Sequence, residues 1–567
     1  MRVLIEPRWR PVYAAFAAAA VLHLLWVRFV ADAGGDLAAQ DAWAAFARSH
    51  PGSAYNLAWY GGMYPVSYSA ISPYVMAILG VRTTMVLAGT ISAAILAYLI
   101  IRTGVVRRPL WPALYGAVAL TGNAVSGRAT FGLGVMFGLA AVACVVTWPA
   151  ASRPPGSSVL RTLPAAVLAA LATAASPVAG LFLGIAAAAL WLEGRRVDGA
   201  TLGVPPVLVL AVSALLFPFA GRQPMPAVSM ILPVVVTLAL MWLSPRSWRV
   251  VRIGSVLYVG AVFAAWVIPS PVGSNITRLG LLFGGVLVVA VAATRLPSPA
   301  RLFAAVQSPS PQVTGVLAAT IITSSVWQVG IAARDVMHMQ PTESQSSGVQ
   351  PLIDWLAGSD ARLGRIEAVP TQSHREAAAL APYVNLARGW NRQADEGRNP
   401  IFYEEDLLTA ASYRAWLDRW AVRYVVVSSA PPDSAAVGEE ALVSQGLPYL
   451  RLVWASAGWT LYRVASPQPI AGRPATVTRF GAAGLVLRVP RPATVLVRIP
   501  SSPWLTLVDA KDSPIDAPFE GCLSTTTVPE TAELPSVTWT VLHAPHAGTY
   551  RISAPYSLAR GSPCGDD

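Results

Sequence analysis

Runs of about 18 to 20 apolar residues recur through the first 330 residues of the chain, and they constrain its fold more than any other feature. A lipid bilayer satisfies no backbone hydrogen bonds, so a chain with many such runs folds as a helical bundle. Only 12% of the residues are charged, against about 25% in soluble domains. We expect about eleven transmembrane helices, at 12–31, 81–101, 109–125, 129–148, 162–176, 177–192, 201–219, 229–244, 252–268, 277–294 and 313–332.

The arginines predict the orientation of this bundle. Fifteen of them fall in one set of loops and five in the other, which makes the first set cytoplasmic by the positive-inside rule. The first set is Arg2, Arg8, Arg10, Arg102, Arg107, Arg108, Arg153, Arg161, Arg195, Arg196, Arg246, Arg249, Arg252, Arg295 and Arg301; the second is Arg48, Arg82, Arg128, Arg222 and Arg278. The N-terminus is then cytoplasmic, and an odd number of helices places the chain after Val329 outside. The net charge of +12 therefore reflects the topology of the membrane bundle and does not indicate nucleic-acid binding.

The remaining sequence predicts three regions in a multi-pass plasma-membrane protein. Residues 1–332 form the bundle, and the first apolar stretch has no small-residue cleavage site behind it, so we expect it to remain as a helix. Residues 333–465 alternate strand and helix patterns and predict an extracytoplasmic α/β domain, whereas 466–567 predict an extracytoplasmic β-sandwich or jelly roll. In the oxidising compartment outside the membrane, Cys522 and Cys564 should form a disulfide; Cys144 lies within a predicted helix as an apolar filler.

The loop 32–72, after the first predicted helix, is the first place where chemistry is expected. It carries Asp36 behind a Gly-Gly break and Asp41 a little further on. A carboxylate at an interfacial turn is well placed to act as a general base. The alternative is that Asp36 caps a helix beginning at Leu37, since Asp is a preferred N-cap residue.

Three arginines on the predicted outer side run against the positive-inside bias. Arg128, Arg222 and Arg278 lie in short outer loops, where guanidinium groups could hold a lipid phosphate in bidentate fashion. Snorkelling to the membrane interface is the alternative explanation.

Aromatic and polar side chains predict contacts to a sugar or acceptor. The first loop is rich in aromatic residues, and an interfacial aromatic belt is the alternative explanation. The α/β region mixes arginine, tryptophan and tyrosine, and an ordinary solvated surface is the alternative explanation there. The acceptor or sugar contacts that we predict are His50, Trp59, Tyr60, Tyr64, Arg388 and Trp390. The polar stretch before the α/β domain is short, so that domain should pack on the loop and bury part of the Trp59–Tyr60 region.

Motifs for nucleotides and metals are absent from the sequence. There is no Walker A, G-x-G-x-x-G, HExxH or CxxC pattern, and the six histidines lack metal-ligand spacing. His23, inside the first helix, is expected to be a buried, hydrogen-bonded residue. Energy must then come from a pre-activated substrate or an ion gradient. The sequence does not identify a cofactor. A divalent cation is possible, but no ligand motif indicates one.

Gly35-Asp36 after the first helix and Trp59-Tyr60-Gly61-Gly62 resemble the GT-C class of membrane glycosyltransferases, in particular actinobacterial arabinosyl- and mannosyltransferases. The resemblance implies a polyprenyl-phosphate-sugar donor and Asp36 as catalytic base, with Asp41 as second candidate. Many members of this class carry two adjacent acidic residues, Asp-Asp or Asp-Glu, and this chain lacks such a pair. The segments 386–393 and 399–403 also resemble an uncharacterised actinobacterial multi-pass membrane protein family. Lys511 is the only lysine, and this preference for arginine is typical of a GC-rich, actinobacterial genome.

These features favour a glycosyltransferase that moves a sugar from a polyprenyl-phosphate donor to a glycan or glycolipid of the cell envelope, on the outer face of the membrane. Two alternatives stay open. A transporter or flippase for a lipid or lipid-linked sugar would need polar groups at mid-membrane depth, of which the predicted spans show few. A non-catalytic scaffold that binds glycan or lipid would need only the outer domains.

Overall fold

The computed structural model describes residues 6–146, 157–295 and 310–567, except 347, 516, 518, 558, 559, 566 and 567. The chain divides into two compact units. The first comprises Met1–Leu37 and Ser69–Met337, and the second comprises Ala38–Tyr68 and His338–Asp567. The loop 32–72 is therefore shared between the two units, and most of it belongs to the second.

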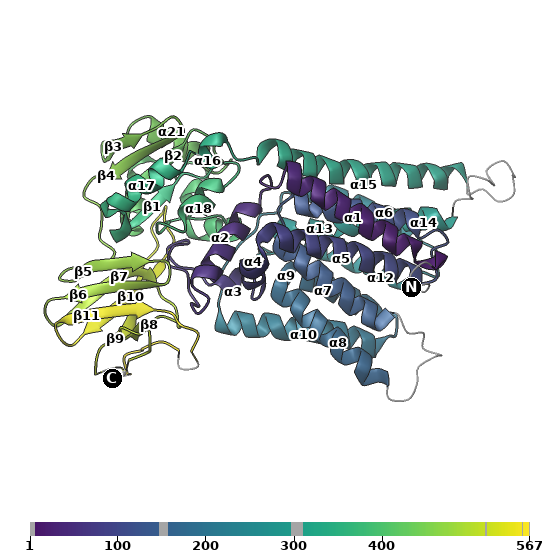
Figure 1. The fold of residues 1–567 in the computed structure, drawn as a ribbon, viewed down its shortest axis with the longest axis horizontal. Helices are drawn as coiled ribbons and strands as arrows, with labels where there is room; N and C mark the ends of the chain where they lie inside the picture. The colour runs from purple at the N-terminus through teal and green to yellow at the C-terminus, as the bar shows by residue number, and fades with distance from the viewer. Residues whose placement is uncertain are drawn as a thin grey trace. The chain divides into compact units, whose positions relative to one another are not determined.

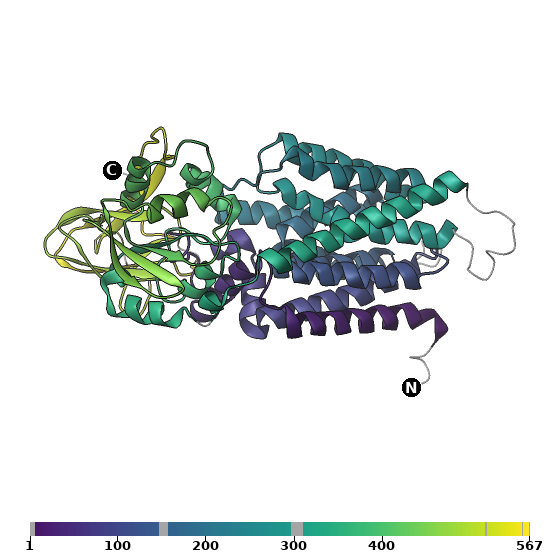
Figure 2. The same ribbon diagram turned by 90° about the horizontal axis from the view of Figure 1, so that it is seen from above.

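The first unit is a bundle of helices that run side by side (Figures 1 and 2). Each of the eleven predicted spans falls on a helix. The last two residues of the span 129–148, and the loop arginines Arg2, Arg153 and Arg301, lie outside the described residues. The helices are α1 (Arg10–Phe29), α4 (Ser72–Leu79), α5 (Val81–Arg102), α6 (Leu110–Val125), α7 (Ala129–Val146), α8 (Ser157–Ala175), α9 (Pro177–Leu192), α10 (Arg196–Leu216), α11 (Ala227–Leu243), α12 (Arg249–Val267), α13 (Thr277–Leu279), α14 (Gly285–Arg295) and α15 (Pro311–His338), with the short turns η2 (Pro7–Trp9), η4 (Gly273–Ile276) and the π-helical η5 (Gly280–Gly284).

This unit has the character of a polytopic membrane protein. Among the described residues, seven helices are long and apolar enough to cross a membrane: Pro7–Phe29, Val81–Arg102, Ala129–Val146, Arg196–Leu216, Arg249–Val267, Gly273–Arg295 and Pro311–His338. Large apolar side chains such as Val207, Leu208 and Leu215 of α10 are exposed, as lipid-facing residues are. The remaining predicted spans are shorter helices, so the count of eleven crossings and the cytoplasmic N-terminus stay predictions.

Small residues line the contacts between α1, α5 and α6. Ala15, Ala19, Ala93 and Ala113 are fully buried, and small side chains let membrane helices approach closely. His23 of α1 is also buried, and its Nδ1 lies 2.7 Å from the carbonyl oxygen of Ala19. The prediction of a buried, hydrogen-bonded histidine is therefore confirmed.

The second unit begins with α2 (Leu37–Ser49) and α3 (Pro65–Tyr68) of the first loop and continues with a small α/β layer. Its sheet has the order β1-β2-β4-β3, in which β1 and β2 are parallel and the other pairs antiparallel. The strands are β1 (Arg365–Ala368), β2 (Val422–Ser428), β3 (Leu450–Ala455) and β4 (Trp459–Val464); the helices are α16 (Glu343–Ser346), α17 (Gln350–Gly358), η7 (Asp360–Leu363), α18 (Arg375–Leu380), α19 (Arg392–Arg398), η8 (Pro400–Phe402), α20 (Ala410–Arg419) and α21 (Val437–Ser444).

Two antiparallel sheets complete the second unit, with the orders β7-β10-β9 and β5-β6-β11-β8. Alternate residues are buried, such as Leu485 and Leu487 on β6 and Val495 and Val497 on β7, which is the pattern of a β-sandwich. The predicted disulfide between Cys522 and Cys564 is confirmed. The strands are β5 (Thr476–Gly481), β6 (Gly484–Val489), β7 (Ala493–Pro500), β8 (Thr506–Val508), β9 (Cys522–Val528), β10 (Val537–Ala544) and β11 (Gly548–Ser553).

Candidate functional site

Asp36 and Arg278 form an ion pair in the first unit. Arg278 lies on α13, and its Nη2 donates to Oδ2 of Asp36 at 3.0 Å. The Asp36 side chain is 32% exposed and that of Arg278 19%, so the pair remains open to solvent on one side. Two candidates that stand far apart in the sequence therefore meet in the fold.

Tyr258 of α12 fixes the backbone around Arg278. Its hydroxyl donates to the carbonyl oxygen of Ile276 at 3.0 Å and accepts from the backbone N–H of Gly280 at 3.1 Å. The π-helical turn η5 follows directly, and such turns are frequent at functional sites. Arg278 is therefore carried on a short, braced segment at the start of an otherwise apolar span.

Arg128 joins this pair from the turn between α6 and α7. The positive charge of Arg278 and the negative charge of Asp36 both act on it. Burial, with Arg278 adding to it, lowers the pKa of Arg128 to about 10, so the guanidinium stays charged at neutral pH. Within the described part of the chain, no carboxylate lies within ion-pair distance of Arg128. We call Asp36, Arg128 and Arg278 the arginine–aspartate group.

Two glycines allow the backbone approach that brings this group together. A Cβ on Gly34 would lie 2.9 Å from the backbone N of Gly127, and a Cβ on Gly127 would lie 2.7 Å from the backbone N of Leu37. Both have positive φ, +131° and +74°. The segment that carries Asp36 therefore lies directly against the turn that carries Arg128, with no side chain between them.

A small cavity lies beside the two arginines. It is lined by Asn123, Ser126 and Gln328 together with Arg128 and Arg278, and it has room for about one water molecule. A larger anion could therefore reach the arginines only from the solvent-exposed side of the group.

Two other candidates stay apart from the arginine–aspartate group. Arg222 is exposed, and no contact among the described residues joins its side chain to Arg128 or Arg278. Asp41 belongs to the second unit, where its Oδ2 accepts from Nη1 of Arg375 at 2.5 Å. The three-arginine clamp that the sequence predicts is therefore reduced to two arginines.

The aromatic residues of the first loop lie in the core of the second unit. Trp59 and Tyr60 are 1% and 0% exposed, and the hydroxyl of Tyr60 donates to the carbonyl oxygen of Gly389 at 3.1 Å. The prediction that the later domain packs on this loop is confirmed. The predicted sugar contacts at Trp59 and Tyr60 need correction, because buried rings offer no face to a ligand. Tyr64 is also buried, against the ring of Tyr55.

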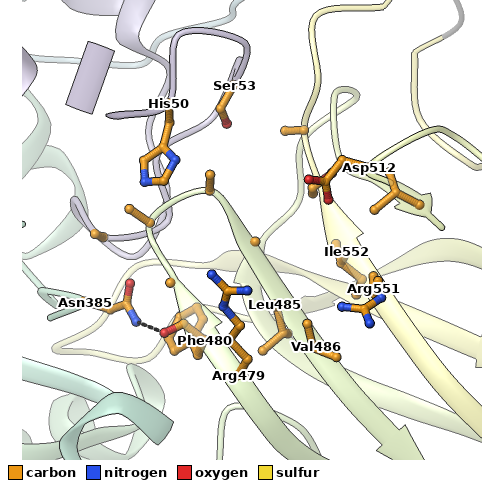
Figure 3. Close-up of a pocket in the computed structure, with 18 of the residues that line it drawn as sticks. His50, Ser53, Asn385, Arg479, Phe480, Leu485, Val486, Asp512, Arg551 and Ile552 are labelled. Atoms are coloured by element: carbon orange, nitrogen blue, oxygen red, sulfur yellow. Dashed lines mark hydrogen bonds between the residues drawn. The ribbon is translucent and has the colours of Figure 1, made fainter. Parts of the chain in front are cut away.

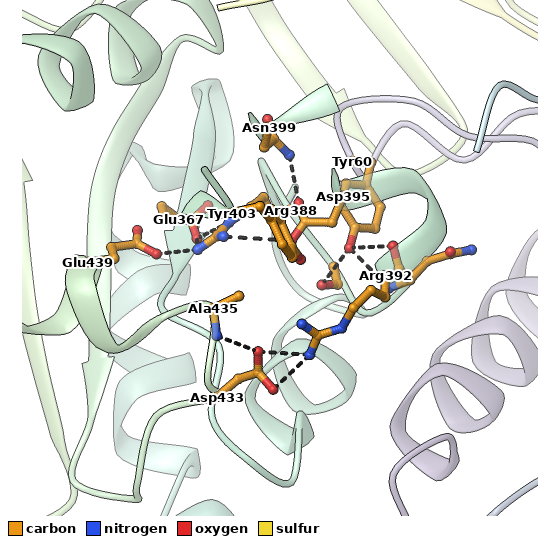
Figure 4. A network of polar contacts seen from close by, with 12 residues as sticks. Tyr60, Glu367, Arg388, Arg392, Asp395, Asn399, Tyr403, Asp433, Ala435 and Glu439 are labelled. Carbon is orange, nitrogen blue, oxygen red and sulfur yellow. Dashed lines mark hydrogen bonds and ion pairs between the residues drawn. The ribbon is translucent and has the colours of Figure 1, made fainter. Parts of the chain in front are cut away.

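Arg388 is the centre of a buried network and cannot contact a ligand at the surface (Figure 4). It pairs with the carboxylates of Glu367, Glu439 and Asp395. Burial raises the pKa of Glu367 and of Glu439, and the charge of Arg388 opposes that rise. The predicted acceptor or sugar contact at Arg388 needs correction for a physical reason: three acidic partners within the core occupy its hydrogen-bond donors.

Trp390 and His50 are the predicted acceptor residues that keep some exposure. The ring of Trp390 stacks on that of His374 with centroids 3.4 Å apart. His50 lies at the end of α2 and lines the large cavity of the second unit, described below. No group of three or more potential metal-ligating side chains was found in the described ranges.

The chain resembles solved structures of membrane glycosyltransferases. Two cryo-EM structures of the mycobacterial arabinofuranosyltransferase AftD, one of them a mutant, match 97% of the chain with 13% identity and TM-scores of 0.49 and 0.46. The chain spans 61% and 58% of their lengths. The Archaeoglobus fulgidus oligosaccharyltransferase matches 81% of the chain and is covered over 74% of its own length, with 11% identity and a TM-score of 0.45.

These matches are of the GT-C class that the sequence resemblance named. Residues 472–567 match the model of a domain of unknown function, DUF8823, which covers the two antiparallel sheets. No curated protein matches the chain by sequence.

Proposed function

We propose that the chain is a glycosyltransferase that uses a polyprenyl-phosphate-linked sugar at the arginine–aspartate group. The observation that supports the proposal is the position of Arg128, a charged side chain for which the described residues provide no ion-pair partner, beside a solvent-open Asp36–Arg278 pair. A cation that is partly buried without a counter-ion is costly, and an anionic ligand would offset that cost. A lipid phosphate supplies such an anion at the end of a membrane bundle.

The reaction assigns a separate role to each member of the group. The Asp36 carboxylate takes the proton of the acceptor hydroxyl as its oxygen bonds to the anomeric carbon of the donor sugar. The bond between that carbon and the phosphate oxygen breaks, and polyprenyl phosphate leaves with one more negative charge than it had as a diester. Arg128 and Arg278 stabilise this developing charge, which is strongest in the transition state.

The donor carries its own activation energy in the sugar–phosphate bond, which is consistent with the lack of a nucleotide-binding motif. The envelope glycan or glycolipid acceptor, the outer face of the membrane and the actinobacterial source belong to the same proposal. A divalent cation is not part of it.

The proposal is tested by transfer assays with purified, detergent-solubilised protein and radiolabelled polyprenyl-phosphate pentose and hexose donors. We expect Asp36→Asn to reduce transfer by about 100-fold or more, as loss of a general base does. Asp32→Asn is the matched control, since Asp32 lies on the same segment in an exposed ion pair with Arg82. It should retain transfer close to that of the native protein.

The arginines provide a second comparison. Arg128→Gln should lower kcat/KM by roughly tenfold or more through loss of a charged phosphate contact, whereas Arg222→Gln should change little. Near-normal turnover of Asp36→Asn would contradict the assignment of Asp36 as the general base. Passage of a lipid-linked sugar across liposome membranes without covalent change would show that the protein is a transporter and not a transferase.

A further inference from the structure

A large cavity lies within the second unit (Figure 3). Its volume is about 590 Å³, within the range of small-molecule sites. Four parts of the chain line it: the end of α2 with the following loop, Arg362 of η7, the segment 381–385, and one sheet of the sandwich with the loop after β8. All of them belong to the same compact unit.

Backbone hydrogen bonds hold the wall of the cavity in place. The N–H of Leu57 donates to the carbonyl oxygen of Ala482 at 2.7 Å, in the turn between β5 and β6. The N–H of Ala54 donates to the carbonyl oxygen of Ala554 at 2.7 Å, just after β11. The loop is therefore attached at two points to the ends of the strands, and the cavity is a built feature of the fold.

Two arginines face this cavity from one face of the sheet. Val486 of β6 pairs with Arg479 of β5 on one side and with Arg551 of β11 on the other. Cross-strand partners share a face, so both arginines lie on the outer face, about 10 Å apart across three strands. A β-bulge lies directly before Arg479, a device that redirects side chains beside binding sites.

The charges around the cavity are unbalanced. Arg362 of η7 adds a third cation, and Asp512 is the one carboxylate among the described residues that line it. None of the three arginines forms an ion pair in the described part of the chain. The burial of His50 and the charge of Arg479 lower the pKa of His50, so it adds no charge at neutral pH. Two net positive charges remain.

The neutral lining is suited to a polyol. Tyr383 exposes 55% of its surface and offers an aromatic face, and Ser53 contributes a hydroxyl group. Asn385 is buried with its Nδ2 bonded to the carbonyl oxygen of Phe480 at 3.1 Å, which leaves its Oδ1 without a hydrogen-bond partner among the described residues. Because that oxygen is itself buried, Asn385 serves to hold the wall of the cavity through its bond to Phe480.

We propose that this cavity binds an acidic saccharide, a short glycan segment that carries phosphate or carboxylate groups. Arg479 and Arg551 bind the acidic groups, and the exposed ring of Tyr383 contacts the sugar ring. Guanidinium groups bind both kinds of anion in bidentate fashion. This proposal concerns binding only and does not depend on the transfer reaction. Loss of transfer in an Asp36 variant would therefore neither support nor contradict it.

Isothermal titration calorimetry of the full-length protein in detergent micelles tests this site. The probes are trigalacturonic acid, maltotriose with one phosphate monoester, neutral maltotriose and inorganic phosphate. We expect at least one acidic trisaccharide to bind at least roughly tenfold more tightly than maltotriose or phosphate. The carboxylate and phosphate probes together show which acidic group the site prefers.

Matched variants assign that binding to the cavity. Arg479→Gln and Arg551→Gln should each weaken it by roughly tenfold at low salt. Arg488→Gln is the control, because Arg488 lies on the same outer face of β6, two residues from Val486, and does not line the cavity. Equal affinity for acidic and neutral trisaccharides, equal affinity for inorganic phosphate, no acidic binding up to about 10 mM, or equal weakening by Arg488→Gln would each overturn the proposal.

Discussion

Glu376 of α18 carries a buried carboxyl group whose titration affects stability. It is 2% exposed and accepts a hydrogen bond from the hydroxyl of Thr371 at 2.5 Å. Burial raises its pKa from 4.5 to about 7. Between these two values the folded protein keeps a proton that the unfolded chain has released, so the free energy of unfolding falls as pH rises through this window, by about 3 kcal/mol in total.

Glu376→Gln removes this titration and keeps a neutral group of the same shape. We expect the variant to be more stable than the native protein at pH 8 and close to it at pH 4.5. Thermal unfolding of the solubilised protein across this range measures the difference. Glu404→Gln, at an exposed carboxyl group, is the control. Equal shifts for both variants would contradict the assignment to Glu376.

At the scale of residues, sequence reasoning identifies charge better than burial. Asp36 and Arg278 could be predicted together because each departs from an expected pattern: Asp36 is a carboxylate at a glycine break, and Arg278 is an arginine in a loop that the positive-inside rule predicts to lie outside. Arg388 could not be assigned correctly, because Glu367 and Glu439 approach it from 21 and 51 residues away, which the sequence does not show. Ion-paired core arginines and ligand-binding arginines have the same local sequence.

At the scale of elements, the segment that carries Asp36 packs against the turn that carries Arg128. A substitution at Gly127, which lies in this contact, tests its importance. Gly127→Ala places a Cβ against the backbone of Leu37 and also requires a left-handed conformation. Gly104 has a similar φ, +68°, and no atom within 4 Å of its Cβ position. Gly104→Ala should therefore cost only the conformational penalty, about 1–2 kcal/mol.

We expect Gly127→Ala to lower the melting temperature more than Gly104→Ala does, and to reduce transfer as well, because the clash separates Asp36 from Arg128. Differential scanning fluorimetry and the transfer assay measure the two effects. If both variants lose the same stability and keep the same activity, the contact does not position the group.

The strands that sequence reasoning misses, β5 and β9, are edge strands. The apolar patterns at 422–428 and 484–489 predict strands, and β2 and β6 have these bounds, whereas no pattern predicts β5 and β9. Both lie at the edge of a sheet, and both carry exposed threonines. An edge strand with an exposed face lacks the alternation of apolar residues on which the prediction depends. The cavity of the second unit could not be predicted for this reason, since β5 carries Arg479.

For the molecule as a whole, the second unit needs both of its parts. A chain that ends at Met337 keeps residues 38–68 but loses the partners that bury Trp59 and Tyr60, among them Gly389. We expect trypsin to cut this truncated chain at Arg48 much faster than it cuts the full chain, as mass spectrometry of the fragments would show. Equal protection of Arg48 in both chains would mean that the loop folds without the later domain.

The shared loop also sets an order of events during synthesis. Residues 38–68 leave the ribosome about 270 residues before His338, the start of their folding partner. At 5 to 20 residues per second, that interval is about 14 to 54 s. During that time the loop, with Trp43 and Trp59 uncovered, waits while the helices of the first unit are made. Biogenesis of this protein therefore includes an obligatory delay in which an aromatic segment must be kept from aggregating. A chaperone or the membrane surface could cover the segment during that time.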